Sequence, residues 1–418
     1  GDLRIRVIVD VGRSSDVVGS WSHALSSMSH CAPAENEDDH ADVHHLLVQH
    51  NVFDADTDVF IQTASVCRTT GIDMALGSIP YKLRLRNDSR TVVEWSTPDV
   101  GVDFVRNVGR WLQRRGVEPS RSVLLRYRTG RLACAQGVCA PACHGCPREA
   151  WWSLYWLRLL DEARQHHLRA CGGEYAARVW CRRPSSKICG PFYRSSKHTG
   201  GVLMLGGDAH QHRQEVVFGV WNSSLRPTTT WSMSKPPECA TGRRGWTEFC
   251  NLLPKKLDVP LLGENDETSR KDVRLPDPYL YESTDVSITF ESMSDYDGYS
   301  TFLTEKILKP VFGAHPFVLV CGAAGALASF RSFGFVTFSP EVDESYDDPW
   351  PEDPSRQSCH APRRVARLIQ SVTSLLESPA RMRRAKAKAA RNRRHFVCPG
   401  GLSARLNAQA VSILGHLA

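Results

Sequence analysis

The chain has 418 residues, which is long enough for two domains with separate cores. Its hydrophobic fraction of 41% is ordinary for a globular protein, and no apolar run approaches the roughly 18 residues that a membrane span needs, so we expect none. The net charge of +7 comes from segment 381–394, which holds eight Lys and Arg residues and no acid. Such a run is either a solvated helix face or a surface for a phosphate-bearing partner.

The N-terminal part has the pattern of an α/β domain. Short runs rich in Val and Ile predict strands over 4–11, 58–65 and 120–128, separated by polar stretches. The first twelve residues lack the layout of a signal peptide, because charges interrupt their apolar part. We therefore expect a cytoplasmic location.

Four of the fourteen cysteines cluster in the segment 134–146, namely Cys134, Cys139, Cys143 and Cys146. The last two have the C-x-x-C spacing that lets two thiolates reach one zinc ion, so a structural zinc is one interpretation. A disulfide and a simple cysteine-rich loop are the alternatives, and the spacing does not decide among the three.

A long helix is predicted over 148–171, because large apolar residues recur at steps of three and four. Its aromatic stripe is typical of a core-facing surface. The stretch 172–199 is irregular and rich in Cys, Pro and Ser. We therefore place an N-terminal domain, on the acceptor side, at 1–199 and a C-terminal domain at 200–418.

The C-terminal part alternates between strands and helices. A strand, a Gly-Gly-Asp turn and a helix start occupy 200–221, and a strand that ends in such a turn is where open α/β sheets bind ligands. Further on, short loops separate the expected elements, which predicts parallel strands with right-handed crossovers. The expected strands are 285–292, 316–322 and 335–339, the expected helices are 304–314 and 323–334, and basic helices end the chain.

The triplet Thr304-Glu305-Lys306 opens one of these helices. Thr304 is a suitable N-cap, and a helix N-terminus offers free amides and partial positive charge to an anion. Lys306 can neutralise a phosphate, and the Glu305 carboxylate can accept hydrogen bonds from the two hydroxyls of a ribose. The alternative is that the acid only complements the helix dipole and the lysine is solvated.

The segment "ITFESMSDYDGYSTFLTEKILKP" resembles the donor-binding segment of α1,3-fucosyltransferases. The longer pattern is most similar to fucosyltransferase-like glycosyltransferases of phages and large DNA viruses, and it covers roughly 200–396. The matching elements are "NLLPKKLD" (251–258) with Asn265, His212-Arg213, Thr304-Glu305-Lys306, Lys309-Pro310, Pro316-Phe317, Phe330-Arg331, Gly334-Phe335, Thr337-Phe338, "DESYD" (343–347) and "ARNRRHF" (390–396). Two departures are "LGG" in place of "LNR" before the His-Arg pair, and Ser292 where these enzymes usually carry Asn.

The resemblance implies a GT-B-like enzyme with two Rossmann-like domains and a cleft between them. The donor would be a nucleoside-diphosphate sugar, with a GDP-sugar preferred over a UDP-sugar, and the acceptor a hydroxyl group of a glycan. The location would be the host cytoplasm or the virion if the protein is viral. By motif, Glu305 would bind the ribose, Lys306 the diphosphate with Thr304 and Lys309 beside it, Arg213 a phosphate, and Glu291 the donor sugar.

Sugar transfer requires a stabilised leaving diphosphate and a deprotonated acceptor hydroxyl. Lys306, Arg213 and helix amides meet the first need, so we expect no catalytic metal. The candidate bases are Asp10, at the end of the first strand, and Asp208 and His210, after the strand near 203.

Three alternatives stay open. Asp-x-Asp pairs at 54–58 and 295–297 would suit a metal-dependent transferase. The basic run would suit an enzyme that modifies nucleic-acid bases, although the near-neutral remainder of the chain does not favour this. A transferase-like half with a cysteine cluster would also suit a non-catalytic adaptor.

We expect the acids of 343–347 to tie down their loop through hydrogen bonds to backbone amides. The alternative is that these acids contact a sugar or a basic partner.

Overall fold

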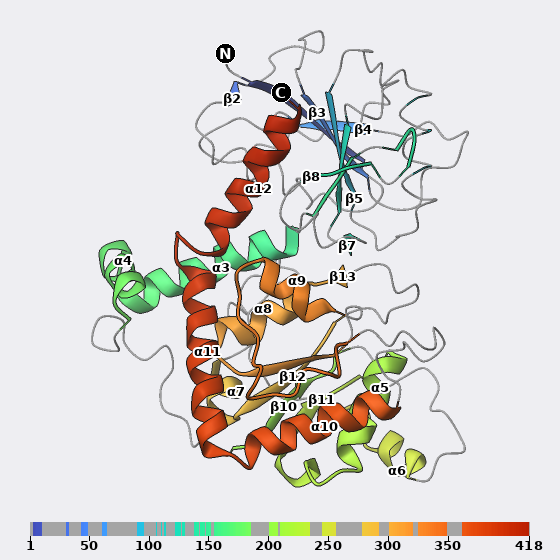
Figure 1. Cartoon of the computed structure of the whole chain (residues 1–418), viewed down its shortest axis with the longest axis vertical. Coiled ribbons are helices and arrows are strands. Elements are labelled where there is room, and N and C mark those ends of the chain that lie inside the picture. Colours follow the sequence, from blue (N-terminus) through green and yellow to red (C-terminus); the bar gives the residue numbers. More distant parts are fainter. Residues whose placement is uncertain are drawn as a thin grey trace. The chain divides into compact units, whose positions relative to one another are not determined.

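The computed structural model describes two compact units, one comprising residues 1–154 and 405–418 and the other residues 155–404 (Figure 1). The described residues are 3–10, 31–32, 43–48, 61–64, 90–95, 106, 110, 113, 122–126, 128–129, 138–141, 143–146, 148–151, 154–184, 200–207, 210–234, 245–255, 278–291, 301–320, 325–348 and 362–417.

The first unit contains a mostly parallel sheet. Its parallel strands run β2-β1-β3-β5-β6-β9, while β4 and β8 join β1 and β9 antiparallel. The predicted strands over 4–11, 58–65 and 120–128 are confirmed as β1, β4 and β6. The bounds are β1 Leu3–Asp10, β2 Cys31–Ala32, β3 Val43–Val48, β4 Ile61–Ala64, β5 Arg90–Trp95, β6 Ser122–Arg126, β8 Val138–Cys139 and β9 Arg148–Trp151.

The second unit is built on a four-stranded, fully parallel sheet in the order β11-β10-β12-β14. The chain leaves β10 through α5 to reach β11 on one side, and it leaves β12 through α8 to reach β14 on the other. The direction of winding therefore reverses between β10 and β12. The bounds are β10 Val202–Leu205, β11 Thr229–Ser232, β12 Val286–Phe290, β14 Phe317–Val320, α5 Gln211–Trp221 and α8 Glu305–Phe312.

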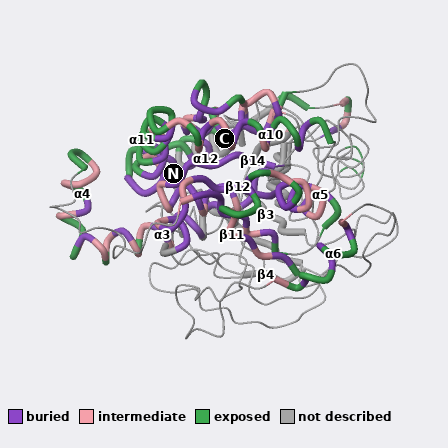
Figure 2. The backbone as a smooth tube through the Cα atoms, turned by 90° about the horizontal axis from the view of Figure 1, so that it is seen from below, coloured by how far each residue is buried: buried purple, intermediate pink, exposed green. Residues whose placement is uncertain are grey.

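Helices cover both faces of this sheet. Right-handed crossovers in opposite directions put α5 and α8 on opposite faces, and Figure 1 shows α8 on one side and α5 with α10 on the other. Figure 2 shows β12 and β14 buried, whereas α11 alternates between buried and exposed residues. The other helices are α3 Leu154–Cys171, α4 Glu174–Arg182, α6 Trp246–Asn251, α7 Pro278–Ser283, α9 Ala326–Ser332, α10 Pro362–Leu376, α11 Pro379–Val397 and α12 Leu402–Leu417.

The α/β class is thus observed, and the second sheet is compatible with a Rossmann-like fold. The expected elements of the C-terminal part are confirmed as β12, α8, β14, α9 and the helices α10 to α12. None of the helices in the described part of the chain is long and apolar enough to cross a membrane.

The first unit ends at Leu154, the first residue of α3, so the division lies at the start of α3 and not at the boundary expected at 199. The reason is that α3 and α4 pack on the second unit. The buried ring of Trp156 lies 4.9 Å from the ring of Phe333, and Cys181 is disulfide-bonded to Cys398. Trp156 is fully buried, as expected for the aromatic stripe.

Three secondary-structure predictions are wrong. The stretch 172–199, expected to be irregular, contains helix α4. The helix expected from residue 148 begins at Leu154, because residues 148–151 pair with β6 as strand β9. The strand expected over 335–339 is not formed, although its residues are largely buried. There, the side-chain amide of Asn392 accepts a hydrogen bond from the backbone N–H of Val336 at 2.8 Å and donates one to its carbonyl at 2.7 Å. A side chain therefore satisfies the backbone groups that a neighbouring strand would have paired.

The acidic segment 343–347 ties down this loop, as expected. The Glu344 carboxylate accepts hydrogen bonds from the backbone N–H groups of Phe338 at 2.7 Å and Ser339 at 2.9 Å. The Asp347 carboxylate accepts one from a backbone N–H in the first turn of α9 at 2.9 Å. These acids hold backbone amides, which is the interpretation that the sequence favoured.

Asp347 gives the fold an expected dependence on pH. Burial raises its pKa from 3.8 to about 7, although the Leu327 N–H and the charge of Arg364 oppose the shift. The folded state thus binds the proton more tightly than the unfolded state, so the contribution is fully present below pH 3.8 and is lost as the pH rises through 7. In the wild type, the free energy of unfolding should fall as the pH rises from 5 to 8. In Asp347→Asn we expect this fall to be smaller by about 2–3 kcal/mol.

Urea denaturation at both pH values measures this difference. Asp348→Asn is the matched control, since Asp348 is the exposed neighbour. A pH dependence that is the same in the wild type and in both variants would contradict the expectation.

Candidate functional site

The site lies at the carboxyl ends of β10 and β12, where the winding of the sheet reverses. Open α/β sheets bind ligands outside the carboxyl ends of their strands at such a reversal. β10 is followed by Gly206, whose missing side chain allows close approach, since a Cβ there would lie 2.7 Å from the carbonyl oxygen of Ser232. β12 is followed by Glu291, which is fully buried.

The His212-Arg213 pair joins these two strand ends from the first turn of α5. The Arg213 guanidinium donates from Nη1 to the Gly206 carbonyl at 2.7 Å and from Nη2 to the Glu291 carbonyl at 3.2 Å. His212 Nε2 lies 3.1 Å from the same Glu291 oxygen. Arg213 is 4% exposed, and its hydrogen bonds link the ends of the two strands. Phosphate binding by its guanidinium stays a prediction.

Glu291 in turn fixes the start of α8. Its Oε1 accepts from the backbone N–H of Thr304 at 2.9 Å, and its Oε2 accepts from the Thr304 hydroxyl at 2.5 Å. The same hydroxyl oxygen accepts from the backbone N–H of Lys306 at 3.4 Å, which confirms Thr304 as the N-cap. The Trp156 indole N–H donates to the Thr304 carbonyl at 3.0 Å. The sequence did not predict this hydrogen bond, because the pattern around Trp156 indicated only a position in the core.

These contacts place two helix starts at one edge of the sheet. α5 begins after His210 and α8 begins after Thr304, and they are the next helices along the chain after β10 and β12. Both N-termini carry partial positive charge, and Lys306 lies half-buried in the first turn of α8. Lys309 is one turn further along α8. Glu305 is the first residue of α8, and its side chain lies outside the described part of the chain.

The three candidate bases are placed differently. His210 occupies the N-cap position of α5, is exposed, and stacks on His212 with ring centroids 5.8 Å apart. Asp208 lies outside the described residues. Asp10 ends β1 in the other unit, with its side chain not described. His210 is therefore the candidate base that the structure places at the reversal of the sheet.

The cysteine cluster shows a disulfide between Cys143 and Cys146, one of the alternatives left open by the sequence. A zinc site on these sulfur atoms would first require reduction of that bond. Cys134 lies outside the described residues, and Cys139 is in strand β8. Within the described ranges, no group of three or more His, Cys, Asp and Glu side chains could hold a metal ion. The Asp-x-Asp pairs at 54–58 and 295–297 lie outside those ranges.

The basic run forms α11, and part of it is engaged with acids. Arg384 and Lys388 both pair with the buried Glu341, the first at 2.9 Å and the second at 2.5 Å. Lys386 pairs with Asp285 at 2.7 Å. These pairs interrupt the positive surface that the sequence suggested.

Comparison of the chain with protein-family models, with curated proteins and with solved structures found no match. The chemistry of the site is therefore argued from its geometry. Two helix N-termini and a lysine at one sheet edge can hold an anion, and an exposed histidine beside them can accept a proton.

Proposed function

We propose that the chain is a fucosyltransferase-like glycosyltransferase, which moves a sugar from a nucleoside-diphosphate donor to a hydroxyl group of a glycan. The observation that carries this proposal is the pair of helix starts at the reversal between β10 and β12, with Lys306 in the first turn of α8. The proposed architecture is GT-B-like, with two Rossmann-like domains and the acceptor bound in a cleft between them.

In the proposed reaction, the bond between the sugar and the diphosphate breaks and the acceptor oxygen takes the place of the diphosphate. Negative charge builds up on the leaving diphosphate, and the Lys306 ammonium and the amides at the start of α8 would stabilise it. Glu305, next to Lys306, would hold the ribose hydroxyls. His210 would accept the proton from the acceptor hydroxyl, the role of a general base.

Glu291 and Arg213 would act through other groups. Because both are buried and hydrogen-bonded to Thr304 or to strand-end carbonyls, they would hold the start of α8 in place for the donor. A direct contact of Glu291 with the donor sugar, which the resemblance implies, is a separate prediction tested below.

A thermal-shift series with GDP, UDP and their sugars tests the proposal. One of these ligands should raise the unfolding midpoint with increasing concentration, because a ligand that binds only the native state stabilises it. Lys306→Ala should weaken that binding at least about tenfold, since a charge-assisted contact contributes about 1.5–3 kcal/mol.

Arg381→Ala is the control, because it removes an exposed positive charge at the start of α11. A shift that persists unchanged in Lys306→Ala would show that the donor site is wrongly placed. If calorimetry detects no binding of any nucleoside diphosphate, the adaptor alternative replaces the enzyme.

The cytoplasmic location stays a prediction, and the disulfides do not support it. Cys181–Cys398 joins segments far apart in the sequence, and Cys171 and Cys250 are also disulfide-bonded. Such bonds persist in oxidising compartments and are rare in the cytosol. An oxidising environment is therefore the location that the disulfides favour.

A further inference from the structure

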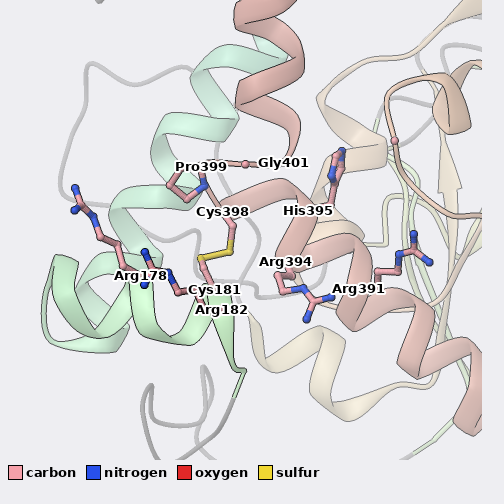
Figure 3. Close-up of a pocket in the computed structure, with 11 residues that line it drawn as sticks. Arg178, Cys181, Arg182, Arg391, Arg394, His395, Cys398, Pro399 and Gly401 are labelled. Atoms are coloured by element: carbon pink, nitrogen blue, oxygen red, sulfur yellow. A yellow bond between two sulfur atoms is a disulfide. The ribbon is translucent and has the colours of Figure 1, made fainter.

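A second basic site lies away from the ends of the strands, in a pocket between α4 and the end of α11. The pocket has a volume of about 620 Å³. Its lining includes Arg178 and Arg182 from α4, Arg391, Arg394 and His395 from α11, and the disulfide Cys181–Cys398, which Figure 3 shows between the two helices. The turn at its edge needs glycine at 401, since a Cβ there would lie 1.8 Å from the His395 carbonyl oxygen.

The pocket has an excess of positive charge. No acidic side chain is among its described lining residues. Arg178 pairs with the exposed Glu174 at 2.5 Å, whereas the side chains of Arg182, Arg391 and Arg394 form no ion pair within the described part of the chain. The C-terminal ends of α4 and α11 contribute roughly half a negative charge each, which offsets about one arginine. About two positive charges therefore remain uncompensated.

We propose that this pocket binds a small molecule that carries two or more phosphate groups. Arginine is suited to this chemistry, because its planar guanidinium binds phosphate oxygens with two parallel hydrogen bonds. Four arginines around one hollow repel each other, and a multivalent anion removes that repulsion. The volume lies within the range of about 300–1,000 Å³ that is typical of small-molecule pockets.

A small ligand fits better than a nucleic acid. A nucleic-acid strand needs a continuous positive path for its backbone. Further along α11, Arg384, Lys386 and Lys388 are paired with Glu341 and Asp285. These ion pairs interrupt the positive charge of α11 between Arg383 and the pocket.

Titration calorimetry with tripolyphosphate and inorganic phosphate tests this proposal on the full chain. The experiment uses the Lys306→Ala background, in which binding at the proposed donor site is weakened. Tripolyphosphate should bind at least about tenfold more tightly than phosphate, because it reaches more than one arginine. Adding Arg182→Ala and Arg394→Ala together should weaken tripolyphosphate at least about tenfold.

Arg383→Ala is the matched control, since Arg383 is an exposed arginine of α11 outside the pocket. It should leave the affinity for tripolyphosphate unchanged. The proposal is overturned if tripolyphosphate does not bind, or if Arg383→Ala weakens it as much as the double variant does. It is equally overturned if a 20-base-pair DNA duplex binds more tightly than tripolyphosphate and loses the same affinity in the double variant and in Arg383→Ala. None of these outcomes depends on the nucleotide series that tests the proposed function.

Discussion

Replacing Glu291 with alanine should lower the free energy of unfolding by about 3–6 kcal/mol, because two hydrogen bonds to a buried carboxylate are lost and each contributes about 1.5–3 kcal/mol. Glu291 is fully buried and accepts from both the backbone N–H and the hydroxyl of Thr304. Without it, the start of α8 loses the acceptor that holds it beside β12. Urea denaturation of the full chain followed by tryptophan fluorescence measures the loss, and Trp156, hydrogen-bonded to the Thr304 carbonyl, is one of the eleven tryptophans that contribute to the signal.

Glu248→Ala is the control for this change. Glu248 lies on α6 with a side chain that is 68% exposed, and within the described part of the chain it forms one ion pair, with Arg226 at 4.0 Å. An exposed pair of this kind contributes about 0–1 kcal/mol. If Glu291→Ala were no more destabilising than Glu248→Ala, the carboxylate would not hold the start of α8.

Glu291→Gln separates a positioning role from direct contact with the donor. Glutamine keeps an acceptor for the Thr304 N–H and can donate to the Thr304 hydroxyl, so the variant should keep most of the stability. If Glu291 acts only by positioning, donor binding should follow stability and survive in this variant. A donor affinity that falls while stability is kept would instead show that the carboxylate touches the donor sugar.

The parts of the site that follow local rules were predictable from the sequence. Thr304 precedes an acid, a base and an apolar run, which is the pattern of an N-cap, and the side chain does cap α8. The continuous apolar run after Pro316 predicted a strand covered on both faces, and β14 is buried along its whole length. The Gly-Gly-Asp sequence predicted a turn between a strand and a helix, and this turn does follow β10 and precede α5, at the end of the strand where open α/β sheets bind ligands.

The parts that depend on distant partners were not predictable. The pattern of residues 335–339 is that of a strand, yet Asn392, more than fifty positions later, satisfies the backbone of Val336. The Trp156 indole N–H donates a hydrogen bond to the carbonyl of Thr304, which lies 148 positions later in the sequence. Neither side chain carries a local signal of its partner, because periodicity reports which face is buried and not which group it meets.

The disulfide Cys181–Cys398 should be the second large contributor to stability. It joins residues 217 positions apart, so it restricts the unfolded chain over a long loop. We expect Cys181→Ser with Cys398→Ser to lower the free energy of unfolding by about 2–5 kcal/mol. Because the bond links α4 to the end of α11, the amides of these two helices should show the largest loss of protection in hydrogen exchange.

The Cys143–Cys146 bond is the matched comparison, since its sequence separation is only 3. In the loop-entropy account, so short a loop contributes about 2 kcal/mol, well below the value for the long loop. The serine pair at 143 and 146 should therefore destabilise the chain less, and protection in α4 and α11 should stay unchanged. If the two serine pairs cost the same, the long bond would not stabilise by restricting the unfolded chain.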